Sequence, residues 1–286
     1  MNMTAQEVLD QSVVDSKFIS TREEMEELIE SKARLLDYTY KMGLDLSGLV
    51  AKNVDFSGLS LPFVSFEDAT LDNCNFIDAV LNGSNMRGIS VKGGDWAGCD
   101  FERSDLTFSF LEMVRLEGTL FKNTTLEQTK FKRCHSPRAN FNGAKMAKCI
   151  LESASYQQAS FVGADLSKTD LLGDFSEANF DGATMVNSDM QWSVFTKSSM
   201  QGVDMSATNF TNADFTLAKI RNSSMKDADF TKSCLQDTMM INSNAQGAKF
   251  KDAFTRSERG VWLVNVMDAD FSDAHEGLKV DNTRTK

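Results

Sequence analysis

The stretch Ala178-Asn179-Phe180-Asp181-Gly182 shows the five-residue unit from which most of this chain is built. A large apolar residue stands at its centre, a small residue two positions earlier, and Asn or Asp directly before the centre. From Leu46 to Leu171 the central position recurs at every fifth residue, and only Ala51 and Ser136 in this series are not large and apolar. The series is Leu46, Ala51, Phe56, Leu61, Phe66, Leu71, Phe76, Leu81, Met86, Val91, Trp96, Phe101, Leu106, Leu111, Leu116, Phe121, Leu126, Phe131, Ser136, Phe141, Met146, Leu151, Tyr156, Phe161, Leu166 and Leu171.

A second series begins after a step of four residues between Leu171 and Phe175. Its further members are Phe180, Met185, Met190, Phe195, Met200, Met205, Phe210, Phe215, Ile220, Met225, Phe230, Leu235, Met240, Ala245 and Phe250. A period of five is neither that of a helix nor that of a simple strand. Another architecture must therefore bury these side chains, and repeats of this kind are typical of solenoids.

This pattern, A(D/N)LXX, resembles that of the pentapeptide repeat family over roughly residues 44 to 275. The resemblance implies an all-β solenoid, namely a right-handed quadrilateral β-helix of about ten coils with an α-helical cap at its N-terminal end. Four pentapeptides would make the four sides of one twenty-residue coil. The central and small residues would point inward, and the other three of each unit would face solvent.

The twenty-residue coil can be tested independently on the outward residues that directly follow every fourth central residue. Their charges alternate strictly along Lys52, Asp72, Lys92, Glu112, Lys132 and Glu152. Neighbours one coil apart would stand ~4.8 Å from each other, where like charges repel. We interpret this charge ladder as a structural feature that favours the stacking register.

We divide the chain into residues 1–43 as a helical N-terminal cap, 44–253 as the pentapeptide repeat β-helix, 254–278 as an irregular last coil that caps the end or makes a dimer contact, and 279–286 as a disordered tail. Thr4 with Glu7, and Ser20 with Glu23, have capping-box spacing, which predicts helices over residues 4–15 and 21–42. We expect the second helix to cover the first coil, because an open solenoid end exposes unpaired backbone groups. The alternative is that this helix binds a partner.

The composition favours a cytoplasmic protein without catalytic chemistry, from a bacterium or a phage. The net charge is −11, but residues 46–250 carry 24 acidic and 19 basic side chains, a net charge of only −5. The five cysteines include no C-x-x-C pair, and no basic leader or long apolar run occurs. The two histidines, His135 and His275, lack partners spaced for a metal site. We expect no cofactor, no metal, no small-molecule substrate and no membrane contact, and the chain is not predicted to be an enzyme.

The preferred functional hypothesis is a non-catalytic rod for protein interaction or assembly, with a partner that the sequence does not identify. In the coil scheme, Phe108, Phe110 and Met113 lie at outward positions around one corner, and Trp192 lies on the same side further along. Apolar residues clustered on a polar rod suggest a contact surface. The alternative is that the N-terminal segment or a local bulge covers them.

A second hypothesis comes from the resemblance, because some pentapeptide repeat proteins mimic DNA and bind type II topoisomerases, which inhibits the enzymes or protects them from quinolones and toxins. A rod of ~48 Å has the length of ~14 base pairs, which would carry on the order of 28 negative charges. A net charge of −5 is a poor copy, although a single acidic side could serve through Asp189, Asp204, Asp214 and Asp229. Six basic residues between Lys130 and Lys148 would oppose such mimicry, and direct nucleic-acid binding is not expected.

The apolar run near the C-terminus predicts a homodimer. Val261, Trp262, Leu263, Val264 and Val266 follow the last regular coil, where a β-helix presents unpaired strand edges. A twofold contact joining two rods through these ends would cover them. The alternative is that residues 268–286 fold back over the run.

Overall fold

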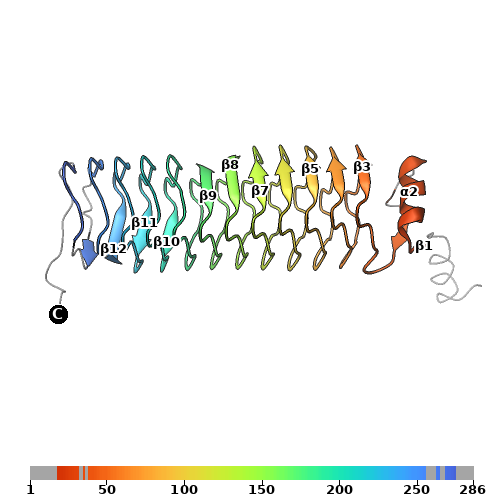
Figure 1. Cartoon of the computed structure of the whole chain (residues 1–286), viewed down its shortest axis with the longest axis horizontal. Coiled ribbons are helices and arrows are strands. Elements are labelled where there is room, and N and C mark those ends of the chain that lie inside the picture. The colour runs from red at the N-terminus through yellow and green to blue at the C-terminus, as the bar shows by residue number, and fades with distance from the viewer. Residues whose placement is uncertain (1–17, 32–34, 36–37, 256–261, 265–267, 275–286) are drawn as a thin grey trace, which may run out of the picture.

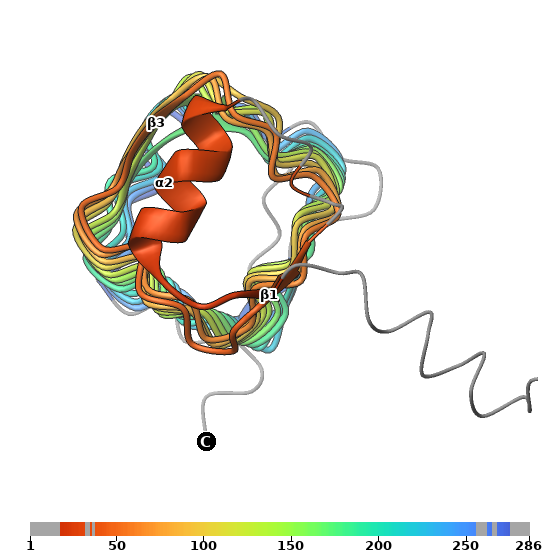
Figure 2. The ribbon, with the colours of Figure 1, turned by 90° about the vertical axis from the view of Figure 1, so that its right-hand side faces the viewer.

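The protein folds into a straight parallel β-solenoid of about 10 turns (Figure 1), which confirms the fold class expected from the sequence. The computed structural model describes residues 18–31, 35, 38–255, 262–264 and 268–274. Seen end-on, the coils superpose as a hollow square in the ribbon (Figure 2), and the side chains of the central positions fill it.

One pentapeptide shows why the chain turns every five residues. Phe66 points inward, and a tight turn follows in which the Ala69 N–H donates to the Phe66 carbonyl over 2.9 Å. Asp68 takes the left-handed backbone conformation (φ 55°) that this turn requires. The Phe66 N–H donates to the carbonyl of Asn85 in the next coil over 2.7 Å, so each unit is bonded to the unit twenty residues away rather than to its own neighbours.

Seven strands along one side of the square form a parallel sheet, and we call this the strand side: β3 (Val50–Lys52), β4 (Thr70–Asp72), β5 (Ser90–Lys92), β6 (Phe110–Glu112), β7 (Lys130–Lys132), β8 (Ile150–Ser155) and β9 (Asp170–Asp174). Their register confirms the charge ladder. Lys52 pairs with Asp72, and each later member pairs with the next as far as Glu152. Beyond β9 the strand side continues through isolated bridges from Asp170 to Asp189 and onward.

The four-residue step predicted between Leu171 and Phe175 is a break in the sheet. The pairing of β8 with β9 shifts between Glu152 and Ala154, so β9 has one residue fewer than β8. Gly173 is required at this point, because a Cβ there would lie 2.6 Å from the Ala154 carbonyl oxygen. The later strands form a second sheet on the opposite edge of the rod in Figure 1: β10 (Ser199–Gln201), β11 (Lys219–Arg221), β12 (Met239–Asn244) and β13 (Trp262–Val264).

The core is a column of stacked side chains. Phe121, Phe141, Phe161 and Phe180 stack in sequence, with ring centroids 4.8 to 4.9 Å apart. Four cysteines at small inward positions are buried and free, and burial raises the pKa of each thiol: Cys74, Cys99, Cys134 and Cys149. This coil-on-coil packing holds the outward residues at fixed positions.

An α-helix covers the N-terminal end, as expected, but it is shorter than the predicted helix over residues 21–42. Helix α2 (Arg22–Glu30) lies across the opening of the square (Figure 2) and buries Met25 and Leu28. Its capping box uses Thr21 and Glu24 rather than Ser20 and Glu23, since the Glu24 N–H donates to Thr21 and the Glu24 carboxylate accepts from the Thr21 N–H. The helix ends at Ser31, and the chain returns to pair β2 (Thr39–Tyr40) with β1 (Phe18–Ile19). The helix predicted over residues 4–15 lies outside the described residues.

Candidate interaction surface

Exposed aromatic residues at the corners are the most unusual outward side chains of the rod. The corners require a left-handed backbone, which favours glycine and asparagine. Among the described residues, three corners at positive φ carry an aromatic side chain instead: Phe63, Phe108 and Trp192, at 59°, 64° and 63°. Their side chains are 56%, 55% and 63% exposed. Burial therefore does not explain why these residues stand where smaller ones would be favoured.

Phe63 and Phe108 each contact the preceding or following coil. A Cβ on Gly83 would lie 2.6 Å from a ring carbon of Phe63, so this ring covers the glycine of the next coil. The Arg87 guanidinium lies 5.5 Å from the Phe108 ring centroid, a cation–π distance. Arg87 is itself held by Asp105, at 3.1 Å. Although burial opposes it, hydrogen bonds from Thr107 and Arg87 lower the pKa of Asp105, so this carboxylate is charged and fixes Arg87.

The structure places Phe108, Phe110 and Met113 on one coil of the strand side, not around one corner as predicted. Phe108 is at the corner where the chain enters this side and Met113 at the corner where it leaves, both at positive φ. Phe110 lies between them in β6 and is half-buried. The prediction was wrong in this detail because two successive corners are five residues apart. The three residues do lie together, and neither the described N-terminal segment nor a bulge in β6 covers them.

Trp192 is on the strand side but apart from that group. Trp192 stands two residues after the central residue Met190, and Met113 stands two residues after Leu111, so both lie at the same corner of the square. They are four coils apart, a distance of ~19 Å along the rod. Trp192 lies beside Leu172, whose side chain is 42% exposed. The two line a shallow hollow of about 330 Å³ together with Asp170, Leu171, Asp189 and Gln191, which we call the tryptophan hollow.

Two carboxylates of the tryptophan hollow face each other across adjacent coils. Asp170 pairs in register with Asp189, one coil further on. Partial burial, and then the charges of Asp189 and Glu152, raise the pKa of Asp170. Asp189 accepts hydrogen bonds from the side-chain amides of Gln191 and Asn209, each over 3.0 Å. The hollow therefore combines exposed apolar surface with crowded negative charge.

The four aspartates proposed for DNA mimicry do not share one side of the rod. Asp189 and Asp229 are on the strand side, whereas Asp204 and Asp214 belong to the columns of Asp165 and Asp174 on the two adjoining sides. Each accepts a bond from the backbone N–H two residues later, as between Asp204 and Ser206 over 3.0 Å, and so shapes its own turn. Asp229 is also paired with Lys249 at 3.4 Å.

Of the predicted dimer residues, Val261 and Val266 lie outside the described residues. Trp262, Leu263 and Val264 form β13, which pairs in parallel with β12. Further along the chain, the Phe271 ring stacks on Phe250 at 5.1 Å. Trp262, Leu263 and Val264 are therefore part of the solenoid, and β13 is the terminal strand of its sheet.

The described part of the chain offers little for other kinds of site. No group of three histidine, cysteine, aspartate or glutamate side chains within it is placed to hold a metal ion. No helix in these same residues has the length and apolar character needed to cross a bilayer.

The sequence did not indicate that Asp170 and Leu172 join Trp192. The four-residue step between Leu171 and Phe175 is visible in the sequence. The coil that contains this step has nineteen residues instead of twenty. An alignment of the outward positions that allows for the shorter coil places Leu172 beside Gln191. That alignment would have brought the hollow together.

Comparison with known proteins gives a consistent result for the repeat. A family model of pentapeptide repeats matches in 8 copies over more than half of the chain, at residues 52–88, 91–123, 99–135, 120–155, 138–173, 174–212 and 198–237. Comparison with curated proteins gave no significant match.

Solved structures with a similar repeat align at low identity. HetL, a pentapeptide repeat protein involved in heterocyst differentiation regulation in the cyanobacterium Nostoc sp., is 18% identical over 96% of this chain and 95% of its own, with a TM-score of 0.30. Trypsin-treated QnrB1, a plasmid-mediated fluoroquinolone resistance protein, is 15% identical over 80% of this chain and 92% of its own, with a TM-score of 0.36. A pentapeptide repeat protein of the Arabidopsis thaliana thylakoid lumen is 24% identical over 43% and 68%, with a TM-score of 0.18.

Proposed function

The chain belongs to the pentapeptide repeat family, and we propose that it is a non-catalytic rod that binds another protein through the strand side of its solenoid. The observation that carries this proposal is the pair of exposed aromatic residues, Phe108 and Trp192, at positive φ on that side. We place its action in the cytoplasm, where the buried free cysteines would remain reduced.

The energetics of the corners support the proposal. The left-handed conformation costs an L-amino acid about 1–2 kcal/mol of conformational energy. The cost is lower for asparagine, because its short polar side chain forms local hydrogen bonds. In the coil after Trp192 the same corner holds Asn212, and in the coil before Phe108 it holds Gly88. Stability alone would favour such residues at both positions. Large aromatic residues are favoured instead at the centres of protein interfaces.

Affinity capture with matched variants tests the proposal. The protein with Phe108→Asn and Trp192→Asn would be compared with the unchanged protein and with Phe63→Asn, a control that removes a corner aromatic from another side. In extracts of the native host, we expect at least one protein to be lost with the double variant and kept with the control. Equal recovery with all three proteins would contradict the proposal.

The second candidate is a DNA mimic that binds a type II topoisomerase. The observation in its favour is that Asp189, Asp204 and Asp214 have no ion-pair partner among the described side chains. Against it, these carboxylates are spread over three sides of the rod. A gyrase supercoiling assay decides between the two. An effect of the purified protein that is weakened by Asp189→Asn, Asp214→Asn and Asp229→Asn would favour mimicry, and no effect at excess protein would exclude it.

A further inference from the structure

The charge ladder of the strand side ends with one cation missing. Lysine and acidic residues alternate from Lys52 to Glu152, each paired in register with the next. The position that follows Glu152 in the ladder should hold a cation, and it holds Leu172. Glu152 therefore has Lys132 in the coil before it but an apolar side chain in the coil after it.

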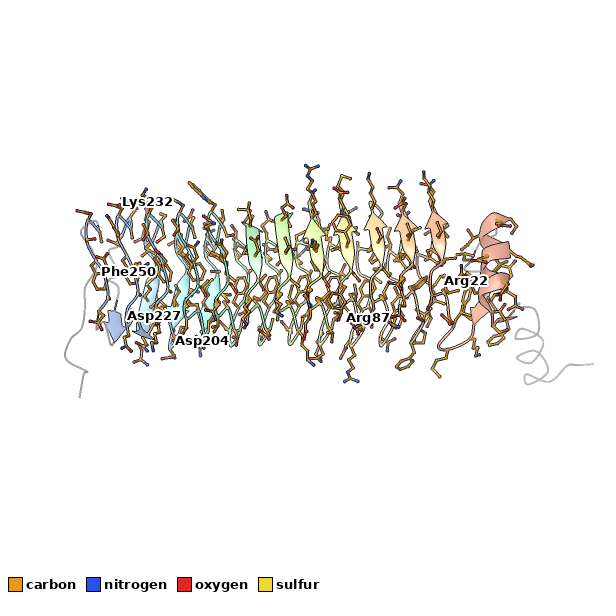
Figure 3. All side chains as sticks on the ribbon, viewed as in Figure 1. Arg22, Arg87, Asp204, Asp227, Lys232 and Phe250 are labelled. Atoms are coloured by element: carbon orange, nitrogen blue, oxygen red, sulfur yellow. The ribbon has the colours of Figure 1, made fainter. Side chains whose placement is uncertain are left out.

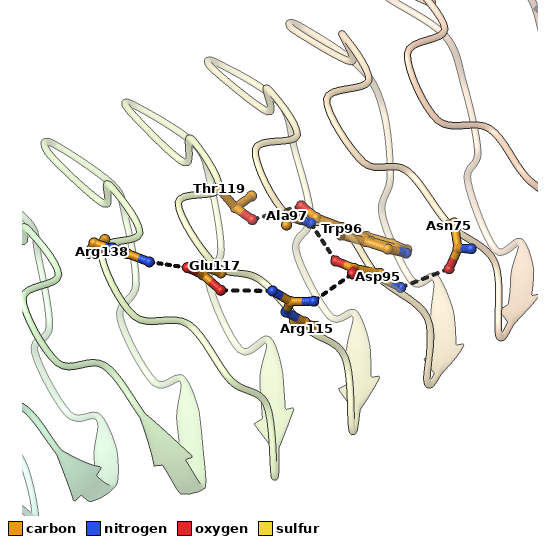
Figure 4. A network of polar contacts seen from close by, with 8 residues as sticks. All are labelled: Asn75, Asp95, Trp96, Ala97, Arg115, Glu117, Thr119 and Arg138. Atoms are coloured by element: carbon orange, nitrogen blue, oxygen red, sulfur yellow. Dashed lines mark hydrogen bonds and ion pairs between the residues drawn. The ribbon is translucent and has the colours of Figure 1, made fainter.

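Negative charge is left unpaired at this point. Of the ion pairs between described residues, none includes Glu152, Asp170 or Asp189. Partial burial raises the pKa of Asp170, and the nearby charges of Asp189 and Glu152 raise it further. Elsewhere on the rod, stacked carboxylates are neutralised by arginine: Figure 4 shows Arg115 between Asp95 and Glu117, at 3.1 and 2.9 Å, and Arg138 on the far side of Glu117.

The apolar part of the tryptophan hollow lies beside this charge. Leu172 and Trp192 line it with Asp170 and Asp189, and both apolar side chains are exposed. An aromatic face next to a carboxylate suits the guanidinium of arginine, which stacks on indole while its edge donates to oxygen, and it also suits the ammonium and aliphatic stem of lysine. The electrostatic and apolar features thus favour the same kind of side chain.

We propose that the tryptophan hollow binds an arginine or lysine side chain of the protein partner, which stacks on Trp192 and supplies the positive charge missing beside Glu152, Asp170 and Asp189. This inference rests on the proposed function, because it specifies the chemistry of the partner segment. The segment carries an apolar residue next to the cation, since Leu172 offers an apolar contact within the same hollow.

The indole N–H signals of the full-length protein provide a direct readout. The chain has 3 tryptophans, so Trp192 can be assigned by its loss in Trp192→Asn. The probe is the capped tripeptide acetyl-Leu-Arg-Leu-amide, and its control carries citrulline, the neutral analogue of arginine. We expect the arginine peptide to shift the Trp192 signal saturably, with an affinity that falls as salt is added. No saturable shift, or equal binding of the citrulline peptide, would overturn the proposal.

Charge-matched variants test whether the effect belongs to the hollow. Asp170→Asn with Asp189→Asn removes two charges there, and Asp78→Asn with Asp237→Asn removes two at distant corners where asparagine suits the positive φ. We expect the first pair to weaken peptide binding about fivefold, the effect of two partly exposed ion pairs, and the second pair to leave it unchanged. Equal weakening by both pairs would show that peptide binding depends only on the net charge of the protein, and it would contradict a binding site in the tryptophan hollow. The peptide measurement can fail while affinity capture still depends on Phe108 and Trp192, so the two proposals can be separated.

Discussion

At the scale of single residues, the corners are where this sequence departs most from what the fold requires. The repeat fixes the backbone conformation at each corner but does not determine which side chain stands there. Trp192 is a bulky residue in the left-handed conformation, and this costs conformational energy. Its indole is 63% exposed, so little burial offsets the left-handed conformation. The cost makes Trp192 a residue whose replacement should improve folding.

We therefore expect Trp192→Asn to raise the free energy of unfolding by about 1 kcal/mol, the difference between a bulky residue and asparagine in the left-handed region. Chemical denaturation followed by circular dichroism would measure it, with Asn212→Trp as the reverse change at the same corner of the next coil. A loss of stability in Trp192→Asn would show that the indole packs on the rod and is structural.

Asp170 gives a prediction that depends on pH. Burial and the charges of Asp189 and Glu152 raise its pKa, so the folded protein holds this proton more tightly than the unfolded chain does. Stability from this group is therefore fully present at low pH and is lost as the pH rises through the raised pKa. Asp170→Asn should raise the unfolding temperature at neutral pH, and the gain should vanish at acidic pH, where the carboxyl is protonated in both states. A gain that is independent of pH would contradict the raised pKa of Asp170.

At the scale of elements, the strand side shows what the sequence could predict. The family resemblance implied the twenty-residue coil, and the charge alternation supported it independently, because stacked neighbours one coil apart must have compatible charges. The strand register confirms the coil length. The coil around Pro137 is regular, and the Ser136 N–H donates to the Ser155 carbonyl over 2.8 Å. Proline fits at this position because it needs no backbone N–H there. At the equivalent position of another coil, the Ala97 N–H donates to the Asp95 side chain and not to the neighbouring coil.

Other elements could not be predicted for physical reasons. The length of α2 depends on the return of the chain to pair β2 with β1, a contact between segments that no local pattern reports. The tryptophan hollow depends on a one-residue change in coil length, which decides the neighbour of each outward side chain after β9. Side chains project from the rod along its whole length (Figure 3), so a shift of one position brings a different set together.

The ladder can be tested by reversing one charge. Glu112→Lys would place three positive charges in one column with Lys92 and Lys132, where Glu112 now lies 3.9 Å from Lys132. We expect a loss of stability of about 0.5–1 kcal/mol that shrinks as salt is added, because the pair is partly exposed. Glu127→Lys, at an outward position outside the ladder, is the control. Equal behaviour of both variants would show that the ladder contributes nothing.

At the scale of the whole molecule, the rod has a covered end and an end whose last sheet terminates in β13. We predict that two rods associate through Trp262, Leu263 and Val264, because the outer edge of a terminal strand can pair with a second chain. Light scattering should give twice the mass of one chain for the intact protein and a single mass for Trp262→Asp with Val264→Asp. An intact protein that is monomeric at micromolar concentration would exclude the dimer.

The central claim is that one side of the rod, and not its whole circumference, contacts a partner. Gln191 on the strand side and Gln201 on the opposite side are exposed glutamines one half-coil apart, which makes them matched positions for a photo-crosslinking residue such as benzoylphenylalanine. Irradiated in cells of the native host, the protein labelled at Gln191 should give a discrete covalent product with another protein, and the protein labelled at Gln201 should not. The same product from both positions, or a product from Gln201 alone, would contradict this account.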